Sequence, residues 1–432
     1  MNWHKHIILT YAGKHISRSW DIQNLFKINK ERLTIFLTFS ALILAFFNSA
    51  NVSFTWSLGL LGPILSCALL IVAMLISNSQ KQKVFTRRDF LLPMIVCILL
   101  YLYLNTMEKK NILGYTFSFF YIFIYFAILR LDARYYQRLS NCICKVLATF
   151  LIVSIAAFFL HLLGANLPHR SASWADWYFY TDYYLFLLDD RYMQQLFPRF
   201  HSIFLEPGHM GTILVLLLAT QIGHWKRWYN LVMMFAMLIS FSLAAYGLFV
   251  ILIFIRMWVL NRHVVRNAII AVTALAAIVG GSFVYKQGDN MLNQLIVLRF
   301  ALNETGDDIV GNNRVSHNLE AEYQTLIHSS DILFGRGKWV DEESMGNAGY
   351  KLFLYEYGIA GFLLVALFYL LSFADVHNKR LYFITVVFAL VNFWIRAYPL
   401  WFAFYIPYFL MVHQHIDTST YDTCKPTLSR HE

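Results

Sequence analysis

Long apolar stretches separated by short polar ones run through most of this sequence. A membrane-spanning helix needs about 20 apolar residues, and fewer where charged side chains at its ends extend toward the lipid headgroups. By this measure the sequence predicts about twelve spans, at residues 33–47, 54–76, 90–104, 112–129, 146–163, 203–222, 268–285, 350–371, 381–395 and 398–412, with two more inside 228–260. As one helix, 228–260 would be about 50 Å long, so we expect a turn in the small, polar segment 240–247.

The predicted fold is therefore an all-α, polytopic membrane protein of about twelve transmembrane helices. The composition agrees, since 58% of the residues are hydrophobic and 14% are charged, whereas soluble domains carry about 25% charged residues. The chain divides into a cytoplasmic segment (1–31), helices 1–5 (32–163), an extracytoplasmic loop (164–202), helices 6–9 (203–285), a second extracytoplasmic loop (286–349), helices 10–12 (350–412) and a cytoplasmic tail (413–432).

The charged residues predict which helix ends face the cytoplasm, because lysine and arginine concentrate in cytoplasmic loops of membrane proteins. With both termini inside, the inner side holds 23 of the 35 basic residues and 8 of the 25 acidic ones. The outer side then holds 12 basic and 17 acidic residues. The net charge of +10 thus reflects membrane orientation, and we expect no nucleic-acid partner.

The stretch 198–211 joins the first outer loop to the sixth predicted span and places ionisable residues at a membrane boundary. Such residues are functional candidates by default. Pro207 suits the first turn of a helix, so Glu206 would lie just before the helix, near the positive end of its dipole. Arg199 and His209 flank this glutamate. The alternative is an arginine–glutamate pair that only anchors the helix end, because such pairs are common and weak.

The second outer loop carries Arg314 and Arg336, together with His317 and Asn347. The guanidinium group is suited to bidentate recognition of phosphate, and a lipid diphosphate presents its charge where these loops return to the membrane. The alternative is that these are solvated loop arginines. Both outer loops contain aromatic residues among their charges, so we expect them to be folded. The aromatic residues fit a belt at the membrane interface, the favoured interpretation, or stacking on sugar rings.

Several short motifs occur in this half of the chain. They are Arg199 with Phe-Leu-Glu-Pro at 204–207, the small-residue turn at 241–247, Arg314, Phe-Gly-Arg-Gly at 334–337, and Glu-Tyr-Gly-Ile-Ala-Gly at 356–361. Together they resemble the Wzy-type O-antigen and capsule polymerases, which are similar in architecture to O-antigen ligases. The resemblance covers roughly the second half of the chain. We expect Gly358 and Gly361 to have a structural role, in which they allow close packing at the start of a helix.

One motif departs from the ligase pattern. Ligases of this superfamily carry a histidine upstream of a Gly-x-x-Gly pair. Here Gly358 and Gly361 form that pair, and Asn347 stands at the histidine position, followed by Ala348. Asparagine cannot act as a general base, so the departure favours a polymerase over a ligase.

The resemblance implies a multi-pass glycosyltransferase of the bacterial inner membrane, with its active site on the periplasmic face. It would join repeat units of O-antigen, capsule or exopolysaccharide, each carried on undecaprenyl diphosphate. The implied partners are these lipid-linked glycans and the lipid bilayer. A chain-length regulator and a flippase are candidate protein partners.

The same reaction assigns expected roles to the singled-out residues. We expect the diphosphate to be bound by Arg199, Arg314 and Arg336. The catalytic candidates are Glu206, His209 and His317 as bases, and Asn347 as a group that orients the acceptor. We expect no metal or other cofactor, because the first outer turn (48–53) has no acidic residue and arginines can neutralise the charge of the diphosphate.

Three alternatives stay open at this point. One is an O-antigen ligase that uses another base. Another is a lipid-linked oligosaccharide flippase or similar transporter, which would place charges along a central cavity within its spans. The third is a membrane anchor or receptor without chemistry. Because most predicted spans lack charge and the polar residues gather in two outer loops, the sequence favours an enzyme that acts at one face.

Overall fold

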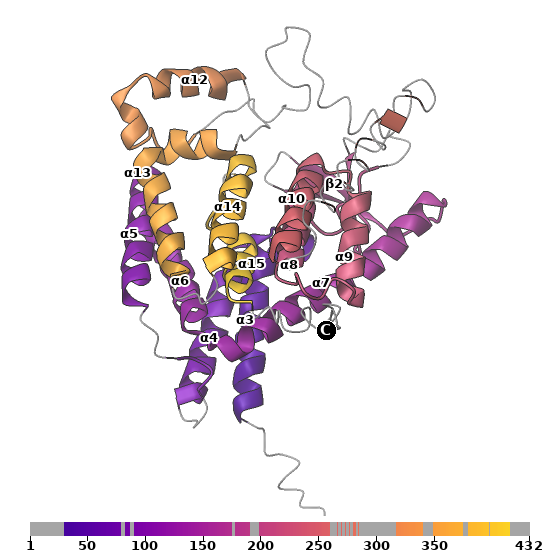
Figure 1. Ribbon diagram of the computed structural model, residues 1–432, viewed down its shortest axis with the longest axis horizontal. Helices are drawn as coiled ribbons and strands as arrows, with labels where there is room; N and C mark the ends of the chain where they lie inside the picture. The colour runs from indigo at the N-terminus through magenta and orange to yellow at the C-terminus, as the bar shows by residue number, and fades with distance from the viewer. Residues whose placement is uncertain are drawn as a thin grey trace, which may run out of the picture.

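The computed structural model (Figure 1) describes residues 30–78, 83–86, 90–174, 178–190, 198–259, 317–339, 349–374, 379–396 and 398–414, with isolated helical positions between 266 and 284. This part of the chain is mostly helical. The α-helices are α3 (Lys30–Ser49), α4 (Leu61–Asn78), α5 (Leu91–Met107), α6 (Ile112–Arg130), α7 (Tyr136–Leu162), α8 (Pro207–Ala219), α9 (Trp228–Ile239), α10 (Leu243–Val259), α12 (His317–Ile327), α13 (Gly349–Ser372), α14 (Lys379–Ile395) and α15 (Phe402–Val412). Short 3-10 helices are η1 (Ser53–Leu58), η2 (Ala133–Tyr135) and η7 (Ser330–Leu333).

Among the described residues, five helices are long and apolar enough to cross a membrane, and six further apolar helices are shorter. These helices indicate a multi-pass membrane protein. They lie close to the predicted spans, and the stretch 228–260 divides, as predicted, between α9 and α10. Helix α7 is longer than the predicted span 146–163, because it begins at Tyr136, ten residues before 146. Its first turns are polar, yet they bury Leu139 and Ile143 against the protein.

Two apolar helices, α8 and α15, form the centre of the helical body. Every residue of α8 and of α15 is buried. A helix that is hydrophobic all round is stable only where other elements cover all of its sides. Helix α15 packs against α3, α7, α8 and α14, and α8 also packs against α9 and α10. In Figure 1 both helices lie between α5, α6 and α13 on one side and α7 and α9 on the other.

The first predicted outer loop contains a small sheet, so the expectation of an all-α fold was wrong for this segment. Strands β1 (Arg170–Trp174), β2 (Tyr178–Asp182) and β3 (Leu187–Asp189) form an antiparallel sheet in the order β1-β2-β3. Strand β2 alternates, with Tyr180 and Asp182 buried and Phe179 exposed. Aromatic residues that are half buried favour such a pleated surface. The loop is therefore folded, as expected, but as strands.

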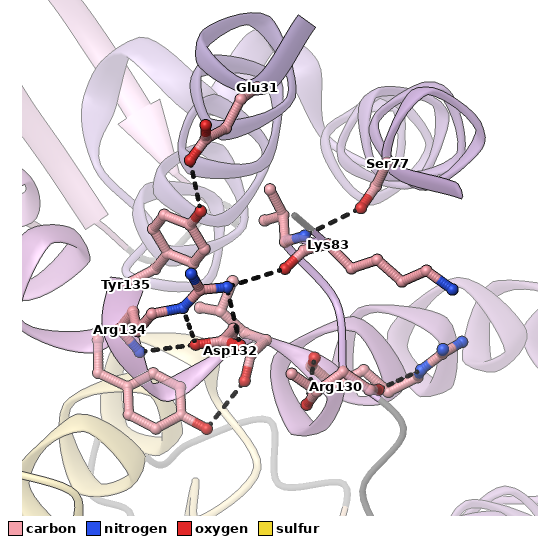
Figure 2. A network of polar contacts seen from close by, with 11 residues as sticks. Glu31, Ser77, Lys83, Arg130, Asp132, Arg134 and Tyr135 are labelled. Carbon is pink, nitrogen blue, oxygen red and sulfur yellow. Dashed lines mark hydrogen bonds and ion pairs between the residues drawn. The ribbon is translucent and has the colours of Figure 1, made fainter. Parts of the chain in front are cut away.

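Polar contacts gather at two opposite ends of the helical body. At one end, Tyr135 donates a hydrogen bond to Glu31 at 3.0 Å and Arg134 pairs with Asp132 at 3.0 Å (Figure 2). Helix α3 begins beside this network and ends at Ser49, whose hydroxyl accepts a hydrogen bond from the backbone N–H of Ala403 at 2.7 Å. Segments predicted to share one side of the membrane thus lie at the same end.

Helix α13 is interrupted at Gly358, where φ is 61° and ψ is −169°. A break leaves backbone carbonyl groups without their helical donors, and lipid cannot replace those donors. A loop that follows η7, together with a side chain of α5, supplies them. The three donors are the N–H of Arg336 to the oxygen of Tyr355 at 2.7 Å, the N–H of Gly337 to Glu356 at 3.1 Å, and the hydroxyl of Tyr103 to Tyr357 at 2.9 Å.

Glycine is required where this loop meets the broken helix. A Cβ atom on Gly358 would lie 2.5 Å from the backbone nitrogen of Gly335, and a Cβ on Gly335 would lie 2.6 Å from the carbonyl oxygen of Glu356. Both glycines have positive φ, 81° at Gly335 and 61° at Gly358, which L-residues rarely adopt. Gly361 is also closely packed, because a Cβ there would lie 2.5 Å from Cβ of Tyr357. The expected structural role of Gly358 and Gly361 is confirmed.

We expect Gly335→Ala and Gly358→Ala each to lower the free energy of unfolding by at least about 1–3 kcal/mol. An alanine there must adopt a positive φ and would overlap backbone atoms of the facing segment. Gly247→Ala is the matched control, because Gly247 is exposed in α10 and a Cβ there meets nothing within 4 Å. The melting temperatures of the purified proteins in detergent measure the difference. An unchanged melting temperature for Gly358→Ala would contradict the close packing of the loop at Gly335 against the break in α13.

Candidate functional site

The candidate site is centred on Glu206, which immediately precedes α8. Its backbone is extended, with φ −142° and ψ 149°, and Pro207 opens the helix. The carboxylate does not cap the helix but points to two other elements. Its Oε1 accepts a hydrogen bond from the hydroxyl of Tyr178 on β2 at 2.9 Å, and its Oε2 lies 3.4 Å from Nη1 of Arg396.

Arg396 follows the last residue of α14, and its guanidinium is largely buried beside the start of α8. The side chain is 11% exposed. Within the described part of the chain, its Nε and Nη2 atoms are buried and have no hydrogen-bond partner. A Cβ atom on Gly208 would overlap Nη2, so a larger residue at this position would displace the guanidinium from the first turn of α8. Buried donors without partners are costly, at about 1–3 kcal/mol for each group.

The electrostatics of the site combine a cation with the positive end of a helix. The N-terminus of an α-helix carries unpaired N–H groups and a partial positive charge. Glu206 is the protein's own counter-charge, and its side chain is 28% exposed. Burial alone would raise the pKa of this carboxyl, but the charges of His209 and Arg396 and the hydrogen bonds from Tyr178 and Arg396 lower the pKa to about 2. The carboxylate is therefore ionised at neutral pH and a weak base.

His209 lies in the first turn of α8 and is brought close to Glu206, as the sequence predicted. Its side chain is buried, and its ring lies 5.6 Å from the ring of Trp401 in an edge-to-face arrangement. The charge of His209 also acts on Glu206. Trp401 precedes α15, so this contact joins the start of α8 to the start of α15.

Arg199 binds the turn at the end of α9. Its Nη2 donates to the carbonyl oxygen of Phe241 at 3.0 Å, and its Nε donates to that of Ser240 at 3.4 Å. A cation at a helix C-terminus complements the helix dipole. The same turn packs on α8, because Cβ of Ser242 would lie 3.5 Å from a Cβ on Gly211. Because Arg199 binds this turn and the turn packs on α8, Arg199 lies at the same end of the molecule as Glu206.

The second predicted loop contributes less to the described site. The guanidinium of Arg336 pairs with Asp331 at 3.0 Å and with Glu322 at 2.9 Å. Arg314 and Asn347 lie outside the described residues, as does the side chain of His317, whose backbone begins α12. The predicted convergence of the two loops on one diphosphate therefore stays a prediction.

A cleft of about 440 Å³ adjoins this cluster. It lies among the ends of α3, α5 and α13, the helix η1 and the segment before α15. Trp401 lines the cleft and also contacts His209. Trp174 lines it as well, and its ring lies 6.0 Å from that of Tyr178, the hydrogen-bond donor to Glu206. Trp401 and Trp174 thus connect the wall of the cleft to residues beside the Glu206–Arg396 pair.

The sequence interpretation missed Arg396, Tyr178 and Trp401 as site residues. A signal for Arg396 was present, because it stands alone between the short apolar stretches 381–395 and 398–412. A charge at such a boundary is a functional candidate on the same grounds as Glu206. Tyr178 and Trp401 belong to aromatic runs, in which no single residue stands out.

Searches against models of protein families, against curated protein sequences and against solved structures each returned no match to this chain.

The pKa of Glu206 generates a prediction on stability. An ordinary glutamate has a pKa near 4.5, and folding lowers it to about 2. The carboxylate therefore stabilises the folded state fully above about pH 4.5, and this contribution is lost as the pH falls toward 2. We expect Glu206→Gln to lower the stability at pH 7 by about 1–3 kcal/mol, and the difference from the wild type to narrow below pH 4.5.

Melting temperatures in detergent between pH 7 and pH 3 measure this difference. Glu322→Gln is the control, because Glu322 pairs with Arg336 in a more exposed setting, where an ion pair contributes about 0–1 kcal/mol. If the melting temperature of Glu206→Gln stayed below that of the wild type by the same amount at every pH, the ionised carboxylate of Glu206 would not be the source of the stability.

Proposed function

We propose that this protein is a polysaccharide polymerase that joins oligosaccharide repeat units carried on undecaprenyl diphosphate, at the outer face of the bacterial inner membrane. The resemblance of the motifs at 204–207, 334–337 and 356–361 to Wzy-type polymerases suggests the reaction. The surroundings of Arg396 support an anionic ligand at this end of the molecule. The product would be O-antigen, capsule or exopolysaccharide.

The observation that carries the proposal is the buried guanidinium of Arg396. Two of its nitrogen atoms have no hydrogen-bond partner in the described part of the chain, and it lies against the first turn of α8 at Gly208. Helix N-termini and arginine donors both favour phosphate groups. A diphosphate oxygen would satisfy these donors and use the positive end of α8. Arg199, which binds the neighbouring turn, and Arg314 are the further candidates for diphosphate binding.

The proposal includes a membrane orientation. The five long and six shorter apolar helices, together with the predicted span at 268–285, would give twelve spans with both termini in the cytoplasm. The end of the body that carries the network of Figure 2 is then cytoplasmic. The opposite end, with Glu206, Arg396 and the cleft, faces the periplasm. The surplus of basic residues in the predicted inner segments supports this orientation.

In the proposed reaction, a hydroxyl oxygen of the acceptor repeat unit attacks the anomeric carbon of the donor glycan. The new C–O bond forms as the bond from the anomeric carbon to the diphosphate oxygen breaks, and the lipid diphosphate leaves with the bonding electrons. Arg396 would stabilise the charge that develops on the leaving oxygen. The hydroxyl proton passes to a base or to the departing diphosphate.

Glu206 fits the role of a fixed partner for Arg396 better than that of the base, because a carboxyl with a pKa of about 2 binds protons weakly at neutral pH. Its hydrogen bond from Tyr178 and its ion pair orient the carboxylate toward the guanidinium. His209, His317 and Asn347 keep the roles expected from the sequence. Arg336 pairs with two carboxylates, which makes it a weaker candidate for the diphosphate than Arg396.

The main rival from another class is a flippase. A flippase that moves a charged headgroup would carry charges along its interior. The ion pairs of the described residues lie at the two ends of the helices, as in the pairs of Glu206 with Arg396 and of Asp132 with Arg134. This distribution favours an enzyme that acts at one face.

The lipid-linked glycans of the host, with and without this gene, test the proposed function. We expect deletion to accumulate single repeat units on the lipid and to remove the polymer ladder. Long lipid-linked chains that are no longer attached to their acceptor would identify a ligase instead. Repeat units confined to the cytoplasmic leaflet would identify a flippase.

A second prediction concerns Arg396. We expect Arg396→Gln to reduce polymer at least about 100-fold, because one transition-state donor contributes about 3–4 kcal/mol. Arg396→Lys should recover little, since lysine keeps the charge but loses the forked donors. Arg170→Gln is the matched control, as the exposed side chain of Arg170 pairs with Asp182 at the same end. Immunoblots of membranes verify equal protein, and wild-type ladders in Arg396→Gln would refute this role.

A further inference from the structure

The cleft contains amide groups that the proposed diphosphate site does not use. Asn48 lies near the end of α3, and Asn51 lies in the turn that follows, with φ of 50°. No hydrogen bond joins the side-chain amide of either residue to another described residue, although both residues are partly buried. The backbone oxygen of Asn51 accepts from Nε1 of Trp56 at 2.9 Å, which fixes the turn. Both residues line the cleft, and neither side-chain amide is committed to a hydrogen bond with another described residue.

Aromatic rings form much of the rest of the wall. Tyr398 and Trp401 stack with ring centroids 4.2 Å apart and an angle of 7° between their planes, and both line the cleft. Trp56 lines it from η1. A sugar ring presents an apolar face of C–H groups and an edge of hydroxyl groups. Flat aromatic rings suit the face, and amide groups suit the edge.

Glu108 supplies a carboxylate to the same cleft. Its Oε1 accepts from the hydroxyl of Tyr357 at 2.6 Å, and its Oε2 pairs with Lys110 at 3.1 Å. A carboxylate has about four acceptor positions, so it can also accept from a ligand. Among the described residues that line the cleft, Glu108 and Lys110 are the charged ones, and they are paired with each other.

We propose that the cleft binds an uncharged sugar residue, with Asn48 and Asn51 hydrogen-bonded to its hydroxyl or acetamido groups and Glu108 accepting from one hydroxyl. The assignment of this sugar to the acceptor glycan rests on the proposed function. A sugar acid would bring its carboxylate toward Glu108, while the cation Lys110 is already paired. A lipid chain would leave the polar groups of Asn48, Asn51 and Glu108 without partners. The volume of about 440 Å³ is within the range of small-molecule sites, about 300–1,000 Å³.

Saturation-transfer difference NMR on the full chain in lipid nanodiscs tests this inference directly. The uncharged probes are lactose, maltose and N,N′-diacetylchitobiose, and the charged probe is glucuronic acid. We expect saturable binding of at least one uncharged probe and weaker binding of glucuronic acid. Asn48→Leu, Asn51→Gly and Glu108→Gln should each weaken binding by about 3- to 10-fold. Glycine is chosen at Asn51 because it tolerates the positive φ.

Asn318→Leu is the control, because Asn318 is exposed on α12 and does not line the cleft. Three outcomes would each overturn the inference. The uncharged probes could bind equally well to the wild type and to all three cleft variants, glucuronic acid could bind more tightly than they do, or no uncharged probe could bind at all. If one variant fails to fold, the other two still decide. If gene deletion removes the polymer but the variants bind sugar like the wild type, the sugar site in the cleft is rejected and the polymerase function stands. If the variants lose sugar binding but gene deletion leaves the polymer ladder intact, the polymerase function is rejected and the sugar site stands.

Discussion

The absence of water inside an apolar helical body constrains every polar group placed there. Such a group must find a partner in the protein or in a ligand. At the break in α13, Arg336, Gly337 and Tyr103 donate to the carbonyl groups of Tyr355, Glu356 and Tyr357. Two nitrogen atoms of Arg396 have no such partner within the described chain. We therefore interpret the first arrangement as scaffold and propose that a ligand acts at the second.

The helices could be predicted from the sequence because an apolar stretch of sufficient length has few alternatives in a membrane. The division between α9 and α10 followed from the same length argument. The sheet at 170–189 was not predicted, because its strands are short and its aromatic residues also fit a membrane interface. The early start of α7 was missed because Tyr136 and Arg138 belong to a polar segment. That segment is helical because it packs on other elements, which no local pattern indicates.

The candidate site could be predicted only where its members are close in sequence. Glu206 and His209 fall within one turn, so their proximity followed from a helix that starts at Pro207. The partner of Glu206 could not be inferred, since Arg396 stands 190 positions away. The sequence left an anchoring pair of Arg199 with Glu206 as an alternative, and in the structure the guanidinium of Arg199 binds the carbonyl groups that end α9. The approach of Arg396 to Glu206 depends on the packing of α8, α10 and α14, which no local sequence pattern indicates.

The joint between α5, the loop after η7 and α13 has a consequence for biosynthesis. The hydroxyl of Tyr103 bonds to the backbone of Phe334 and Tyr357, which follow it by 231 and 254 positions. During translation, α5 therefore enters the membrane long before its partners exist. This end of the bundle can close only after α13 has been synthesised and its break at Gly358 has received the loop. An unfinished chain therefore lacks the contacts that join α5 to this loop and to α13.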